Sequence, residues 1–173
     1  MSNPQVLVLT VIGSDRPGLV GAISKVVSDH GANWEASHMA RLGGQFAGIL
    51  QVAVADETAE SLAASLRELG PAGLQVTVMH DAEVEEPEGQ GYWLELVGSD
   101  QPNIVRDISE ALATLGVTVL ELSSELSDAP VSGGKLFKLQ ASIRCPSGVQ
   151  RAQLSESLEE LANSLMVDLS LND

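Results

Sequence analysis

The fold of this chain is decided by a short stretch that occurs twice, GSDRPGLVGAIS at residues 13–24 and GSDQPNIVRDIS at residues 98–109. Seven of the twelve aligned positions are identical. In both copies an apolar, β-branched run stops at the glycine, and a pattern of helical period begins after the proline. We therefore predict a duplication, with a first domain at residues 1–82, a linker at 83–90 and a second domain at 91–173, each of a usual domain size.

The segments around each copy predict the element order β-α-β-β-α-β. In the first copy the run at residues 5–12 predicts a strand, and apolar residues then recur at helical spacing until Gly31. Residues 33–42 alternate between two faces, and the glycines at 43–44 turn them into a hairpin. A helix over 59–69 and a strand over 74–80 complete the unit. With right-handed crossovers this order produces a ferredoxin-like α+β fold, an antiparallel sheet with both helices on one face.

The charge of the chain excludes several classes of partner. Nine basic and twenty-four acidic residues give a net charge of −15. Neither half has a basic face, because four cations stand against ten anions up to Glu85, and five against fourteen from Glu86 onward. Nucleic-acid binding requires clustered Lys and Arg, so we expect no direct contact with DNA or RNA, and no binding to an acidic membrane surface.

The remaining composition is typical of a protein from a reducing compartment. Cys145 is the single cysteine, so it forms no internal disulfide and offers no metal-ligand spacing. The first thirteen residues predict a strand rather than a signal peptide, because no basic residue precedes their apolar run. No stretch approaches the roughly 20 apolar residues of a membrane span. We therefore expect a cytoplasmic protein without a metal. The uncovered sheet face or edge strands of so small a domain also favour pairing, and a homodimer is one form of it.

The repeated turn has two interpretations, and the residues alone leave both open. Gly13 allows an unusual φ and a close approach of a ligand to the backbone. Asp15 near the helix N-cap accepts backbone N–H groups, and Pro17 suits the first turn. These structural roles explain the residues of the turn without a ligand. Alternatively, spare N–H donors at the helix start bind a small anion while Asp15 holds an ammonium group, which together suit the two charges of a free amino acid.

Residues 9–33, LTVIGSDRPGLVGAISKVVSDHGAN, followed by SHMARLGGQFAGILQV at 37–52, resemble an ACT domain, a ligand-sensing module of amino-acid metabolism. Two such modules in tandem resemble the glycine cleavage system transcriptional repressor family. This resemblance implies a regulatory protein that responds to an amino acid such as glycine. It also implies repression through a partner transcription factor, and no cofactor.

The resemblance also nominates ligand-binding residues at matching positions. In the first copy these are Gly13, Asp15, Arg16, Pro17, Gly18 and Asn33. In the second copy Asn103 stands at the position of Gly18, and Thr118 stands at that of Asn33. The resemblance therefore implies a weaker second site at Gly98, Ser99, Asp100 and Asn103.

Catalysis finds little support in the sequence. His38 and His80 have no neighbouring His or Cys, and His30 closes a predicted helix, where it favours the negative end. The acidic run at 83–88 is typical of a solvated linker rather than of a cation loop. We expect a non-enzymatic regulator, with a ligand-free protein-interaction module as the alternative and a small enzyme as a distant third.

Overall fold

The computed structural model describes residues 4–80, 87–129 and 133–173. The chain divides into two compact units, Met1–Val84 and Glu85–Asp173. Of the expected linker, residues 83–86 lie outside the described residues, as does most of its acidic run. Residues 87–89 belong to no helix or strand, and Gln90 begins the next strand.

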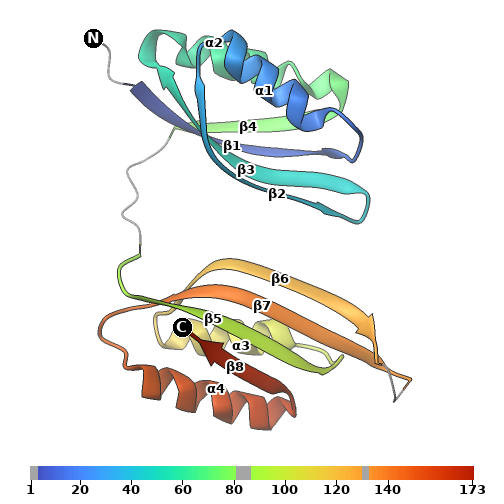
Figure 1. The fold of residues 1–173 in the computed structure, drawn as a ribbon, viewed down its shortest axis with the longest axis vertical. Coiled ribbons are helices and arrows are strands. Elements are labelled where there is room, and N and C mark those ends of the chain that lie inside the picture. The colour runs from blue at the N-terminus through green and yellow to red at the C-terminus, as the bar shows by residue number, and fades with distance from the viewer. Residues whose placement is uncertain (1–3, 81–86, 130–132) are drawn as a thin grey trace. The chain divides into compact units, whose positions relative to one another are not determined.

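The first unit has the predicted order of elements. They are β1 (Pro4–Ser14), α1 (Leu19–Asp29), β2 (Asn33–Leu42), β3 (Gln45–Ala55), α2 (Asp56–Arg67), the 3-10 turn η1 (Gly70–Ala72) and β4 (Leu74–His80). The strands form an antiparallel sheet in the order β2-β3-β1-β4. Both helices cover the same face of this sheet (Figure 1).

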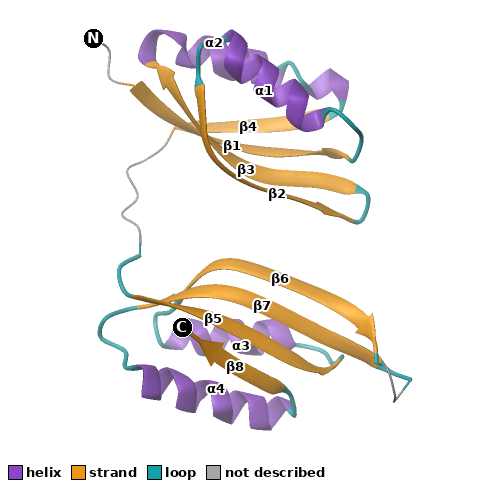
Figure 2. Cartoon of the chain, in the orientation of Figure 1, coloured by secondary structure: helices purple, strands orange, loops and turns teal. Residues whose placement is uncertain are grey.

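The second unit repeats the arrangement. Its elements are β5 (Gln90–Ser99), α3 (Ile104–Thr114), β6 (Thr118–Asp128), β7 (Lys135–Cys145), α4 (Arg151–Leu165) and β8 (Asp168–Asn172). The strand order β6-β7-β5-β8 is equivalent to that of the first unit, and again one face carries both helices (Figure 2). The predicted α+β fold with two ferredoxin-like units is therefore confirmed. No helix among the described residues is long and apolar enough to cross a membrane.

Each unit builds its core from aliphatic side chains, because alternate positions of the two central strands face the helices. In the first unit Leu7, Leu9 and Val11 of β1 are fully buried in one cluster with apolar side chains of both α1 and α2. In the second, Leu94 and Leu96 of β5 take the same role.

One sequence-based detail is wrong, because the alternation over residues 33–42 is not continuous. A β-bulge interrupts β2 between Trp34 and Ala36, and β6 has a bulge at the equivalent place, between Val119 and Glu121. The extra residue shifts the pattern by one, so Trp34 packs on the core from the same side of the strand as Met39.

The sheet faces away from the helices differ in charge between the units. In the first unit the positions of this face that the strand register pairs contain no Asp, Glu, Lys or Arg, and Glu35 stands unpaired at the bulge of β2. Ile12, Ile49 and Met79 on this face are 45%, 56% and 60% exposed. On the second unit the equivalent face carries acidic and basic side chains, among them Glu95, Glu121, Glu125, Lys138, Arg144 and Asp168.

Candidate functional site

The two copies of the repeated stretch adopt the same strand-to-helix corner. In the first unit the Asp15 N–H donates to the Gly44 carbonyl at 2.9 Å, and in the second the Asp100 N–H donates to the Lys135 carbonyl at 3.0 Å. Each helix is then preceded by a residue in the left-handed region, Gly18 with φ 91° and Asn103 with φ 73°. Asparagine is among the few residues that adopt this conformation readily, which explains its substitution for glycine.

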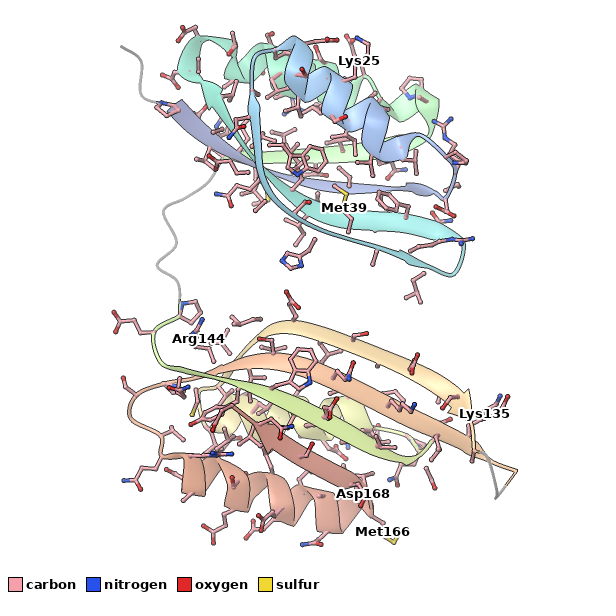
Figure 3. The ribbon with its side chains drawn as sticks, in the orientation of Figure 1. Lys25, Met39, Lys135, Arg144, Met166 and Asp168 are labelled. Atoms are coloured by element: carbon pink, nitrogen blue, oxygen red, sulfur yellow. The ribbon has the colours of Figure 1, made fainter. Side chains whose placement is uncertain are left out.

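A side-chain contact ties each corner to the segment just before the last strand of its unit. Arg16 Nη2 donates to the Ala72 carbonyl, and Gln101 Nε2 donates to the Leu165 carbonyl at 2.5 Å. The acceptor residue is followed in both units by a left-handed residue, Gly73 with φ 84° and Met166 with φ 52°. Figure 3 shows Met166 between α4 and β8. Arg16 is therefore committed to a structural contact within its own unit.

Gly13 and Gly98 are required by packing at the corner. Gly13 lies in β1 and is absent from the glycines with positive φ, contrary to the expectation of an unusual φ. A Cβ at Gly13 would overlap the Gly73 carbonyl oxygen, and one at Gly98 would overlap the Val167 side chain. The close approach expected at Gly13 therefore occurs with the protein's own backbone.

Asp15 does not cap the helix as the sequence predicted. The N-cap of α1 is Gly18, which provides no side-chain capping bond, and Pro17 precedes the helix rather than starting it. The carboxylate Oδ2 of Asp15 is instead 2.6 Å from Arg41 Nε, at the end of β2. The first-turn N–H groups of α1 therefore have no side-chain cap, and the Asp15 charge faces a cation.

Arg41 is the site residue that sequence reasoning missed. It stands opposite Phe46 in the register of β2 and β3, and Phe46 is paired with Gly13. The same alignment in the second unit runs from Gly98 through Phe137 to Leu126. Leucine thus replaces arginine there, and no ion pair holds Asp100 within the described parts of the chain. The sequence spacing alone did not identify Arg41, because its place beside Asp15 depends on the register of three strands.

Asn33 is not part of the same corner. Through Ala53 it is aligned with Val6, whereas the corner lies beyond Gly13 at the other end of β1. At about 3.3 Å per strand residue the two points are about 23 Å apart along the sheet. A small molecule at the Asp15 corner does not reach Asn33 of the same unit, so the two predicted elements of the site are separated.

The helix starts differ in charge. The first turn of α1 contains no acidic residue, whereas that of α3 contains Asp107, which pairs with Arg106 at 2.7 Å. An anion at a helix N-terminus is stabilised by the dipole and the free N–H groups, and a carboxylate in the first turn opposes a second anion. The start of α1 is therefore the more favourable of the two for an anionic group.

Two surface hollows lie on the sheet faces away from the helices. A hollow of about 190 Å³ at the end of β1 is lined by Ile12, Gly13, Ser14, Gln45, Gly73 and Gln75. A larger groove of about 350 Å³ on the second unit contains Glu95, whose carboxylate accepts a 2.6 Å hydrogen bond from Gln140. Neither hollow is lined by Asp15 or Arg41, which lie toward the helix-covered side.

His30 and Cys145 have structural surroundings. His30 Nδ1 is 2.8 Å from the Val26 carbonyl at the end of α1, as its predicted helix-closing role requires, and its Nε2 is 3.2 Å from Ser65 Oγ of α2. Cys145 is 1% exposed, and burial raises the pKa of its thiol. Among the described residues no group of three or more His, Cys, Asp and Glu side chains could hold a metal ion.

Comparison with known proteins gives a match to the first unit and further matches over nearly the whole chain. The family model for the ACT domain matches residues 5–79. The chain is 25% identical to the glycine cleavage system transcriptional repressor of Escherichia coli (strain K12), over 99% of this chain and 92% of that protein. A crystal structure of an unknown protein from Galdieria sulphuraria is 30% identical, with a TM-score of 0.88 over 98% of both chains. A crystal structure of a candidate glycine cleavage system transcriptional repressor shares the fold, at 24% identity and a TM-score of 0.74, over 99% of this chain and 98% of the other.

Proposed function

Because this chain is a tandem ACT-domain protein that resembles the glycine cleavage system transcriptional repressors, we propose that it is an amino-acid-responsive accessory repressor. It acts on transcription through a protein partner rather than by binding DNA. The observation that carries the proposal is the similarity to the bacterial repressor over nearly the whole of both chains. Its place in the cytoplasm remains a prediction from the sequence.

The corner of the first unit supports the sensing part of this proposal. The N-terminus of α1 has no side-chain cap and no first-turn carboxylate, so it favours the carboxylate of a ligand. Asp15 supplies the opposite charge for an ammonium group, and its side chain is 27% exposed. The proposed ligand is therefore a free amino acid, glycine or one of similar size, bound by the first unit at Asp15 and the turn through Gly18.

The charge distribution supports the partner part of the proposal. A net charge of −15 repels a polyanion, so repression by direct DNA contact is disfavoured. The first unit offers instead a sheet face whose paired positions carry no Asp, Glu, Lys or Arg, and on which Ile12, Ile49 and Met79 are about half exposed. Exposed apolar surface of this kind is typical of protein contact sites. We assign this face to the transcription-factor partner.

A thermal-shift panel of the twenty amino acids tests the sensing part. A ligand present at a hundredfold its dissociation constant adds about 2.7 kcal/mol to the stability of the protein that binds it. One or a few small amino acids should therefore raise the melting temperature clearly, and Asp15→Ala should abolish the rise. Asp100→Ala is the matched control in the second unit and should leave most of it. Flat curves for all twenty would refute amino-acid sensing.

A capture experiment tests the partner part. The wild-type chain as bait in extract of its native cell should retain a transcription factor, identified by mass spectrometry. Ile49→Glu places a charge in the apolar face and should lose this protein, whereas Ser123→Glu on the polar face of the second unit should keep it. Equal retention by both variants would show that the apolar face is not the contact.

The ligand-free interaction module remains the second candidate, and one observation favours it. Arg16 and Gly13 at the corner already make contacts within the protein, to Ala72 and Gly73. These contacts account for both residues without a ligand. The two candidates are separated by the same pair of experiments, because the module captures a partner while the amino-acid panel stays flat.

A further inference from the structure

We propose that Arg41 joins the start of α1 in binding the carboxylate of the amino-acid ligand, so that the Asp15–Arg41 pair forms a single zwitterion-binding site in the first unit. This inference rests on the proposed sensing function and extends it, because it names a ligand-binding residue outside the repeated stretch. It also limits each chain to one such site.

The geometry of the ion pair carries the inference. Arg41 contacts Asp15 Oδ2 through Nε at 2.6 Å, and its side chain is 72% exposed. The guanidinium group presents five N–H donors in a fixed fork, so binding through Nε leaves its terminal amino groups for a second carboxylate. With its Nε on the Asp15 carboxylate, the guanidinium group of Arg41 is oriented to donate from its terminal amino groups to the carboxylate of a ligand.

The charges of the pair match those of the ligand. An α-amino acid carries an ammonium and a carboxylate on adjacent carbon atoms, and Asp15 and Arg41 place an anion and a cation in direct contact. The ammonium lies against the Asp15 carboxylate while the ligand carboxylate lies against the Arg41 guanidinium. Charge-assisted hydrogen bonds of this kind are stronger and geometrically more specific than neutral ones.

The second unit shows what this arrangement requires. At the position of Arg41 it has Leu126, which is 56% exposed, and the first turn of α3 carries Asp107. Asp100 is retained there, so an ammonium has a partner, but a carboxylate finds no guanidinium and is opposed by the charge of Asp107 at the start of α3. The second unit therefore does not bind a zwitterion, although its backbone corner is the same.

Isothermal titration of the full chain with glycine, L-alanine and L-serine tests the inference. At least one of them should bind wild type with about one site per chain. Arg41→Leu, which copies the second unit, should weaken that binding by about tenfold or more, the change expected for loss of a charge-assisted hydrogen bond. Lys25→Leu is the matched control, since it removes the same charge from an exposed ion pair of 2.6 Å on α1, and it should leave the affinity unchanged.

The amide of the best-binding amino acid of the three separates binding from positioning, because it keeps the ammonium and lacks the carboxylate. If Arg41 contacts the carboxylate, the amide binds wild type about tenfold more weakly than its amino acid, and Arg41→Leu removes that difference. If Arg41 only orients Asp15, Arg41→Leu weakens both ligands equally, which overturns the inference while sensing stands. Binding that Arg41→Leu leaves unchanged also overturns it, as does a stoichiometry of two. Absence of any binding to wild type overturns the sensing proposal itself.

Discussion

Replacing Gly13 by alanine should destabilise the first unit while leaving the second unit unchanged. A Cβ at this position would overlap the backbone carbonyl oxygen of Gly73 and would lie 3.3 Å from Leu74 Cδ1. A carbonyl held between η1 and β4 cannot rotate away as a side chain would. Forcing one extra methyl group into such a contact costs about 1–3 kcal/mol, which outweighs the roughly 0.5–1 kcal/mol by which alanine is otherwise preferred to glycine in a strand.

The chain offers a way to measure each unit separately, because it contains two tryptophans and one lies in each unit. In a Trp93→Phe background the fluorescence of Trp34 reports urea unfolding of the first unit, and a Trp34→Phe background reports the second. Gly13→Ala should lower the urea midpoint in the first background only. For a unit of this size the cost corresponds to a melting point lower by about 4–8 °C per kcal/mol.

Gly21→Ala is the control for this prediction. Gly21 lies in α1, its φ is not positive, and a Cβ there has no atom within 4 Å. Alanine in an exposed helix position is favoured over glycine by about 1 kcal/mol, so this variant should raise the midpoint of the first unit. If Gly13→Ala matched or exceeded wild type in stability, the argument that the Gly73 carbonyl requires a glycine would be refuted.

Three further predictions concern other contacts. Met166→Gly should stabilise the second unit by up to about 1 kcal/mol, because Met166 is 85% exposed and has φ 52°, a conformation that costs non-glycine residues about 1–2 kcal/mol; a lower urea midpoint would contradict this. Ser65→Ala removes the contact to His30 and should lower the free energy of unfolding of the first unit by about 1 kcal/mol, which is measured as a lower urea midpoint. An unchanged midpoint would mean that the contact adds no stability. Cys145 is buried and the pKa of its thiol is raised, so iodoacetamide at pH 8 should label the native protein at least about tenfold more slowly than the urea-unfolded chain; equal rates would contradict its burial.

The fold was predictable from the sequence because its signals are local and occur twice. Each copy contains, within about twenty residues, an apolar run, a glycine, a proline and a pattern of helical period. The two copies therefore predict the same elements independently. The hairpin was equally predictable from its two adjacent glycines, and Gly43 and Gly44 both have positive φ in the structure. Local patterns of this kind are read without knowing which strand pairs with which.

The site was only partly predictable because its contacts depend on register. Arg41 reaches Asp15 through the pairing of three strands, and nothing in the spacing between these residues indicates that they meet. Register also separates Asn33 from the corner. The bulge after Trp34 also shifts the alternation by one residue, which the regular pattern of residues 33–42 did not indicate.

The uncharged sheet face of the first unit has a consequence for the speed and salt dependence of association. A partner that docks there finds no local charge to guide it and must approach a chain of net charge −15. Without electrostatic steering, association rate constants are about 10⁵–10⁶ M⁻¹s⁻¹. Such a complex should therefore form slowly and survive high ionic strength. If the partner is acidic, added salt should accelerate its binding by screening the repulsion between the two proteins.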